Sequence, residues 1–164
     1  MRSATRPVVA VVGPAQPDGE AVLTAAREVG AGLAAAGCTV VTGGLGGVMA
    51  AASQGAREAG GFVVGILPGE EAEAANEFVD LAVPTGLGEG RNLLVVRMAQ
   101  VVIAVGGSWG TLAEIALARR RVTPVVSLLG WEITGPEKDQ NVVVATDSAS
   151  AVRNALALLR PPGD

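Results

Sequence analysis

Short runs of valine and other apolar residues alternate along the chain with longer alanine-rich stretches that contain regularly spaced polar residues. An unbroken apolar run is typical of a strand buried on both faces of a parallel sheet, and the mixed stretches are typical of the helices that cover it. The runs predict strands at residues 7–12, 38–41, 62–67, 78–83, 101–105, 124–129 and 142–145. The mixed stretches predict helices at 19–36, 48–59, 91–99, 111–121 and 148–159.

This alternation of strands and helices predicts an α/β fold, a Rossmann-like three-layer sandwich with a mostly parallel sheet of about seven strands. We expect residues 1–164 to form one domain, because the length suits one domain and no linker or repeat interrupts the pattern. The acidic segment 70–77 favours a solvated loop or short helix over a functional lid, and 131–140 is expected to be a polar loop.

Composition removes several classes of chemistry. The chain has no histidine, which excludes the commonest general base, the commonest zinc ligand and every Ser-His or Cys-His nucleophile. Its single cysteine, Cys38, lies in an apolar run and is expected to be buried, so we predict no internal disulfide and no metal site. The aromatic residues are few, which predicts an aliphatic core.

Charge and hydropathy bear on partners and location. The net charge is −4, and neither a basic stripe nor interleaved aromatic residues occur, so we expect no nucleic-acid partner. A small anionic ligand remains compatible with this balance. The N-terminus shows no signal-peptide pattern and the apolar runs are too short to span a membrane, which predicts a cytoplasmic protein without membrane contact.

Two glycine-rich segments follow predicted strands and open predicted helices, Gly43 to Gly47 and Gly106 to Gly110. In open α/β sheets ligands lie beyond the carboxyl ends of the strands, where helix N-termini offer free N–H groups and a partial positive charge. The first segment has neither a P-loop lysine nor the G-x-G-x-x-G spacing, which argues against a nicotinamide dehydrogenase. We expect a phosphate-bearing ligand to be bound by Gly43, Gly44, Gly46, Gly47, Arg91, Asn92, Gly107, Ser108, Trp109, Gly110 and Thr111.

Glu114 supports two interpretations. Thr111-Leu112-Ala113-Glu114 fits the S/T-x-x-E capping box, and this pattern alone favours a structural role. However, Arg91 opens the preceding helix and is expected to face the same crevice, where a guanidinium and a carboxylate would suit a phosphoribosyl group. Arg91 and Glu114 are therefore the candidate catalytic residues. Trp109 is equally compatible with stacking on a ligand ring and with filling an interface.

These segments resemble a known enzyme family. Residues 43–49 and 106–114 are similar to the motifs GGGSxGLMG and PGGxGTxxE of the LONELY GUY phosphoribohydrolases, and Arg91 falls at the arginine of the family's M-H-x-R-K motif. Over nearly its whole length the chain is more similar still to a bacterial branch of Rossmann-type nucleotide-binding proteins, related to the molybdenum cofactor carrier protein, in which Arg-Asn replaces Arg-Lys.

The resemblance implies a protein that binds or carries a nucleoside monophosphate or a molybdenum cofactor, with no resident cofactor required. The alternative is a phosphoribohydrolase that cleaves the N-glycosidic bond of a nucleoside 5′-monophosphate, with Glu114 stabilising an oxocarbenium ion and Arg91 holding the phosphate or leaving base. The chain departs from the motifs, and binding tolerates such departures better than catalysis does. The altered positions are Thr42, Gly88, Glu89, Gly90, Asn92, Gly106 and Ser108.

Two further expectations accompany the resemblance. Relatives are often labelled lysine decarboxylases, but pyridoxal-phosphate chemistry needs a Schiff-base lysine, and the only lysine is Lys138, in a hydrophilic loop. We therefore expect no such activity.

The family also implies a homodimer or homotetramer with its sites near a two-fold axis. The sparsely charged segments 48–59 and 93–99 are consistent with contact surfaces.

Overall fold

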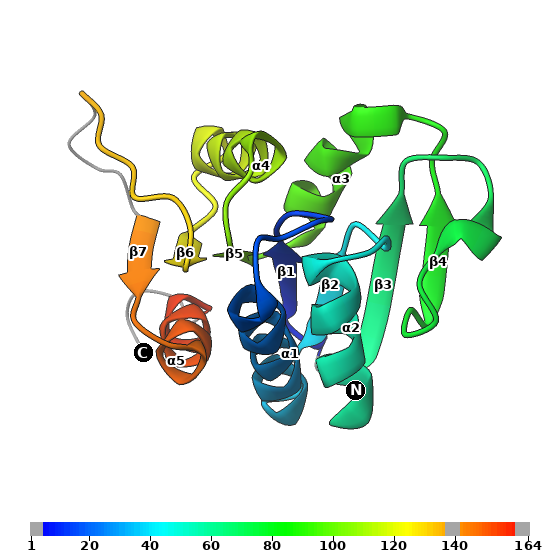
Figure 1. The fold of residues 1–164 in the computed structure, drawn as a ribbon, viewed down its shortest axis with the longest axis horizontal. Helices are drawn as coiled ribbons and strands as arrows, with labels where there is room; N and C mark the ends of the chain where they lie inside the picture. The colour runs from blue at the N-terminus through cyan, green and yellow to red at the C-terminus, as the bar shows by residue number, and fades with distance from the viewer. Residues whose placement is uncertain (1–4, 137–141, 160–164) are drawn as a thin grey trace.

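The centre of the molecule is a sheet of seven parallel strands in the order β4-β3-β2-β1-β5-β6-β7 (Figure 1). A computed structural model describes residues 5–136 and 142–159; Lys138 and part of the predicted 131–140 loop lie outside them. The strands are β1 Val8–Val12, β2 Thr39–Thr42, β3 Phe62–Leu67, β4 Leu81–Pro84, β5 Val101–Val105, β6 Val125–Leu128 and β7 Val142–Ala145.

Helices cover both faces of this sheet (Figure 1). Their bounds are α1 Glu20–Ala35, α2 Val48–Glu58, α3 Arg91–Met98, α4 Trp109–Arg120 and α5 Ser148–Leu158, with short 3₁₀ helices η1 Ala72–Ala74 and η2 Gly88–Gly90. Helices α1, α2 and α5 pack with one apolar cluster, and α3 and α4 pack with the other. The predicted three-layer α/β sandwich is thereby confirmed.

Successive side chains of each strand point to opposite faces of the sheet, and this alternation creates the two apolar clusters. In β1, Val9 and Val11 contribute to one cluster, whereas Ala10 and Val12 contribute to the other. Both clusters consist almost entirely of valine, alanine, leucine and isoleucine, as the composition predicts. Cys38 is buried among them, and this burial raises the pKa of its thiol, which is typical of an unreactive core cysteine.

The strand order reverses at the centre of the sheet. The chain runs outward from β1 through β2 and β3 to β4, and then crosses by α3 to β5, which pairs with the other side of β1. Val12 at the carboxyl end of β1 is in register with Ala104 near the end of β5. The connections that leave these two strands diverge to opposite sides, so they open the crevice in which α/β proteins of this topology bind ligands.

The fourth strand begins later than its sequence predicts, at Leu81 and not at residue 78. The Asn76 side chain donates hydrogen bonds to the carbonyl oxygens of Gly44 and Leu45 at 3.2 and 2.9 Å, which fastens the preceding segment to the loop after β2. Glu77 and Phe78 then form a turn, and Asp80 reaches β3 through hydrogen bonds with Val63 before the strand begins. The segment 70–77 contains η1 and its glutamates are exposed, in agreement with the predicted solvated loop or short helix.

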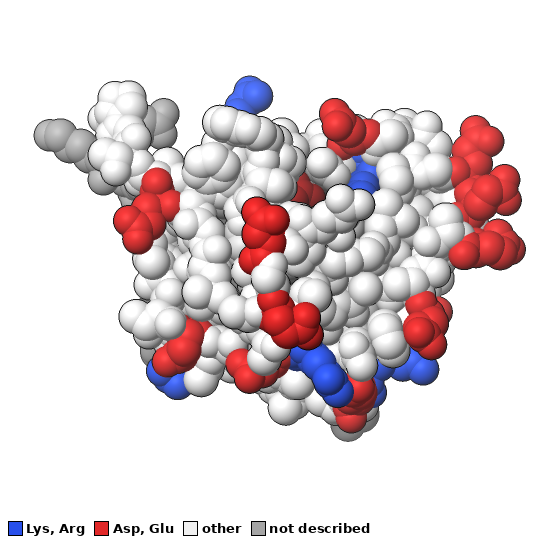
Figure 2. Space-filling view, viewed as in Figure 1, with Lys and Arg blue, Asp and Glu red and all other residues white. Residues whose placement is uncertain are grey.

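The charged side chains on the face shown in Figure 2 are mainly acidic, with one group at an edge and the others scattered. Figure 2 shows acidic side chains gathered at the edge of the molecule where η1 and β4 lie, with few basic side chains on the face in view. The acidic group corresponds to Glu70, Glu71, Glu73 and Glu77. None of the helices within the described ranges is both long and apolar enough to cross a membrane.

Candidate functional site

A cavity of about 340 Å³ lies at the reversal point between β1 and β5. Its size is near the lower end of the range for small-molecule sites, which suits a single nucleotide-sized ligand. Six segments supply its lining: the ends of β1 and β2, the start of α2, the segment after β3, η2 with the start of α3, and the first half of α4. The lining residues are Val12, Gly13, Pro14, Ala15, Gly43, Met49, Pro68, Gly88, Glu89, Arg91, Asn92, Ser108, Gly110, Thr111 and Glu114.

Two glycines allow the walls of the cavity to come together. A Cβ atom at Gly13 would collide with the Val105 carbonyl oxygen and with the Val48 side chain. A Cβ atom at Gly43 would collide with the guanidinium of Arg91 and the sulfur of Met49. A larger residue at position 43 would therefore displace the arginine from the cavity wall.

The start of α4 differs from the predicted capping box. Ser108 is the N-cap residue, with extended backbone angles, and its Oγ accepts a hydrogen bond from the Thr111 amide at 3.2 Å. The helix consequently begins at Trp109, so Thr111 is its third residue and Glu114 lies beyond the first turn. The prediction that Thr111 and Glu114 form a capping box is wrong, because Ser108 satisfies the helix start two residues earlier than expected.

Arg91 is a buried cation at the first position of α3. Only 8% of the residue is exposed, and its Nε atom is buried without a hydrogen-bond partner. Burial lowers the pKa of its guanidinium, and the nearby Glu114 carboxylate opposes this shift. A buried Nε–H without an acceptor is destabilising for the free protein, and a buried cation on the cavity wall favours an anionic ligand.

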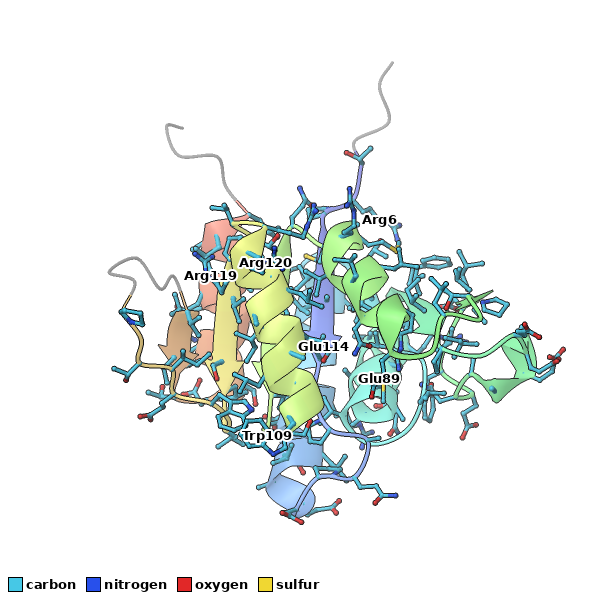
Figure 3. All side chains as sticks on the ribbon, turned by 90° about the horizontal axis from the view of Figure 1, so that it is seen from above. Arg6, Glu89, Trp109, Glu114, Arg119 and Arg120 are labelled. Atoms are coloured by element: carbon cyan, nitrogen blue, oxygen red, sulfur yellow. The ribbon has the colours of Figure 1, made fainter. Side chains whose placement is uncertain are left out.

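Glu114 lies on α4 across the same cavity. It is also only 8% exposed, and burial raises the pKa of its carboxyl to about 7, with Arg91 acting in the opposite direction. In Figure 3 Glu114 lies about halfway along α4, on the side toward β1, with Glu89 across from it on the segment before α3. The cavity therefore combines one buried cation with one buried, proton-exchanging carboxyl.

Several of the residues predicted to bind ligand line this cavity together. They are Gly43, Arg91, Asn92, Ser108, Gly110 and Thr111, joined by Glu114. Two glycines of the first cluster instead shape the turn from β2 to α2. Gly44 donates to Thr42 Oγ1 at 3.1 Å, and Gly47 has a φ of 61° and no room for a Cβ beside the Pro14 and Ala15 carbonyls. Gly46 is exposed and does not line the cavity.

Trp109 and Gly107 lie outside the cavity lining. Trp109 is 78% exposed and packs against Trp131, with ring centroids 5.3 Å apart. Trp131 covers Gly107 and donates from Nε1 to the Ser108 carbonyl at 3.0 Å. In Figure 3 Trp109 lies at the start of α4, and Arg119 and Arg120 lie at its opposite end, far from the cavity.

Sequence reasoning missed part of the lining. The turn Gly13-Pro14-Ala15 follows β1 at the reversal of strand order, and a predicted strand order would have identified it. Gly88 and Glu89 fall at altered motif positions next to Arg91 but were not predicted to bind ligand, and Pro68 carries no comparable signal, because only the folded arrangement brings it to the cavity. Within the described ranges, no group of three or more His, Cys, Asp or Glu side chains is arranged to hold a metal ion.

Comparisons with known proteins agree with this architecture. A protein from Rippkaea orientalis, described as a molybdenum cofactor binding protein, is 34% identical, with a TM-score of 0.89 over 96% of this chain and 100% of that one. The molybdenum cofactor carrier protein of Chlamydomonas reinhardtii is 36% identical, with a TM-score of 0.83 over 94% of this chain and 99% of that one.

Sequence comparison gives the same assignment. An uncharacterized protein of Archaeoglobus fulgidus is 40% identical over 120 residues, which cover 73% of this chain and 78% of that protein. The model of the SLOG cluster4 family matches residues 6–159. The resemblance to the superfamily of molybdenum cofactor carriers is thus confirmed, and the chain belongs to the SLOG cluster4 family.

Proposed function

We propose that this protein binds and carries a small phosphate-bearing heterocycle, a molybdopterin-type cofactor or a nucleoside monophosphate, in the cavity between β1 and β5. The observation that carries the proposal is Arg91, a buried cation on the cavity wall whose Nε has no hydrogen-bond partner. Two similar structures, from Rippkaea orientalis and Chlamydomonas reinhardtii, are of molybdenum cofactor binding and carrier proteins.

The residues present fit such a cargo. A phosphate placed against the start of α4 would receive the helix dipole and the unpaired amides of its first turn, and Arg91 would neutralise its charge. On the opposite wall, Gly13 and Gly43 let the Val48 side chain and the Arg91 guanidinium lie close to the backbone. A molybdopterin-type cofactor holds its own metal through sulfur, so the protein has to recognise a phosphate and a ring and needs no cluster of metal ligands.

A second candidate function, hydrolysis of a nucleoside 5′-monophosphate, is favoured by Glu114. A buried carboxyl with a pKa of about 7 is suited to proton exchange at neutral pH, and it shares the cavity with Arg91. In this function Glu114 would stabilise the ribosyl oxocarbenium ion and orient water, while Arg91 would hold the phosphate or the leaving base. Carriage requires only that Arg91 holds the phosphate and requires no catalysis by Glu114.

A paired titration and turnover assay separates the two functions. We expect wild-type protein to bind nucleoside monophosphates much more tightly than the corresponding nucleosides, and to release no free base over a panel of nucleoside monophosphates. Base release that disappears in Glu114→Gln would establish the hydrolase instead. Absence of binding for every phosphorylated heterocycle, including a molybdopterin-type cofactor, would refute both functions.

We also propose that the protein is a homodimer or homotetramer. The apolar face of α2 is already covered within the chain, whereas Leu87 before η2 and Leu93 and Met98 on α3 are between 38% and 57% exposed. Burying these side chains in a second copy would remove apolar surface from water. Light scattering at micromolar concentration should give at least twice the 16.3 kDa chain mass, and Leu93→Glu should lower it; a wild-type monomer would contradict this.

Two further statements remain predictions: the protein works in the cytoplasm, and it binds no nucleic acid. The dispersed acidic surface in Figure 2 supports the second of them, because the face in view offers no continuous basic track for a phosphate backbone.

A further inference from the structure

Among residues 5–136 and 142–159, no hydrogen-bond donor reaches the Glu114 carboxylate. The residue is 8% exposed. The ion pairs in these ranges, Arg27–Glu58 and Arg57–Asp80, lie on the surface away from the cavity. Arg91 is close enough to influence the Glu114 carboxyl electrostatically, yet forms no ion pair with it.

A structural role does not account for this residue. Ser108 caps α4, and its hydroxyl lies 2.9 Å from the Thr111 hydroxyl, so these two groups satisfy each other at the helix start. Glutamate buried without donors costs free energy that a glutamine or leucine at this helical position would largely avoid. The Glu114 carboxyl faces the cavity, so its free acceptor positions are open to the molecule that occupies it.

We propose that Glu114 recognises the paired N–H donors of a 2-amino-4-oxopyrimidine ring, the edge shared by guanine and pterins, and so selects these rings over adenine. This inference rests on the proposed function, since it assigns the ring of the ligand whose phosphate Arg91 holds. The ring N–H and the neighbouring amino group point in the same direction and match the two oxygens of a carboxylate. Adenine presents an amino group beside an unprotonated ring nitrogen, which would face a carboxylate oxygen unfavourably.

The position of Glu114 along α4 suits this role. Glu114 comes five residues after the first residue of the helix, which corresponds to about 7–8 Å along the helix axis at 1.5 Å per residue. A ligand whose phosphate lies at the helix start and whose ring lies beside Glu114 therefore needs a spacer of about the size of a ribose. Guanosine monophosphate and a pterin carrying a phosphate on its side chain both have such a spacer.

A second carboxylate in the cavity, Glu89, provides a matched control for Glu114. Glu89 also lines the cavity, but from η2 at the mouth, where the residue is exposed. Water competes for the hydrogen bonds of an exposed carboxylate, so Glu89 should contribute little to discrimination between rings. Glu89→Gln removes the same charge from the same cavity without removing the buried acceptor.

The test compares matched ligands by calorimetric titration. Guanosine monophosphate is compared with inosine monophosphate, which lacks the 2-amino group, and with adenosine monophosphate. A pterin monophosphate is compared with the corresponding lumazine monophosphate, in which a carbonyl oxygen replaces the same amino group. If guanosine monophosphate binds more tightly than the pterin monophosphate, the ligand class is a nucleotide. The opposite order identifies a pterin. In wild-type protein and in Glu89→Gln, we expect loss of the amino group to weaken binding at least tenfold, and adenosine monophosphate to bind more weakly still.

The variant Glu114→Gln should reduce this discrimination to less than about threefold while leaving affinity for adenosine monophosphate equal or slightly higher, because a negative charge near the phosphate is lost. Two results would overturn this inference: equal affinities for the ligands with and without the amino group in wild-type protein, or unchanged discrimination in Glu114→Gln. If binding still requires Arg91, the proposed function would stand. Failure of every phosphorylated ring to bind would refute the proposed function together with this inference.

Discussion

Replacing Arg91 by alanine should weaken the binding of a nucleoside or pterin monophosphate by about 1.5–3 kcal/mol, or about 10- to 150-fold. The reason is that the variant removes a charge-assisted hydrogen bond to phosphate from a buried position, where water cannot replace it. Affinity for the unphosphorylated nucleoside should change far less. Calorimetric titration with the matched pair of ligands measures both effects.

The matched control is Arg97→Ala, which removes an exposed arginine from the same helix, outside the cavity lining. It should leave the affinity for the monophosphate within about twofold of wild type. If Arg91→Ala lowered the affinities for nucleoside and monophosphate equally, the guanidinium would shape the cavity and would not hold the phosphate.

The second large effect concerns stability. Glu114→Gln should increase the free energy of unfolding of the ligand-free protein by about 3 kcal/mol at pH 8, with the increase vanishing below about pH 4. In the folded protein the pKa of Glu114 is raised from 4.5 to about 7, chiefly by burial. The folded state therefore binds a proton more tightly than the unfolded state, so the glutamate lowers stability progressively as pH rises from about 4.5 to 7.

The glutamine variant removes this penalty because it carries no charge to bury. Denaturant unfolding at several pH values between 4 and 8 measures the difference from wild type. The exposed substitution Glu89→Gln should stay within about 0.5 kcal/mol of wild type throughout. A gain in Glu114→Gln that is the same at pH 5 and pH 8 would show that charge burial is not its cause.

The amino-acid pattern was sufficient to predict the sheet. The strands β3, β5 and β7 begin and end at the predicted residues, because each is an apolar run set off by turn-forming or polar residues. The start of β4 was predicted wrongly, since Asn76 holds the preceding segment on the loop after β2, and such a contact between distant residues has no local signal.

The helix start after β5 shows a different reason for error. Ser108 and Thr111 are both good N-cap residues, and the glutamate three residues after Thr111 favoured the later start. In the structure Ser108 is the N-cap residue, and its hydroxyl oxygen accepts a hydrogen bond from the Thr111 amide. Because the N-cap lies three residues earlier than the capping box placed it, Glu114 is beyond the first turn and its carboxyl is free to face the cavity.

The candidate site was predictable in part. Arg91 and Glu114 were expected to share a crevice, because each follows a glycine-rich turn at the carboxyl edge of the sheet, and the structure does place both on one cavity. The glycines of the first cluster divide between two roles that sequence does not distinguish. Gly43 makes room for Arg91, whereas Gly47 makes room for the turn after β1.

The central claim, that this cavity carries a phosphorylated heterocycle unchanged, is tested most directly by recovery of the cargo. Purified protein is incubated with nucleoside monophosphates and with a molybdopterin-type cofactor released from a molybdoenzyme, passed through gel filtration and unfolded, and the released ligand is identified by mass spectrometry. We predict an intact phosphorylated heterocycle, retained by wild type and by Arg97→Ala but lost from Arg91→Ala. Recovery of a free base with ribose phosphate, or equal retention by Arg91→Ala, would contradict the account.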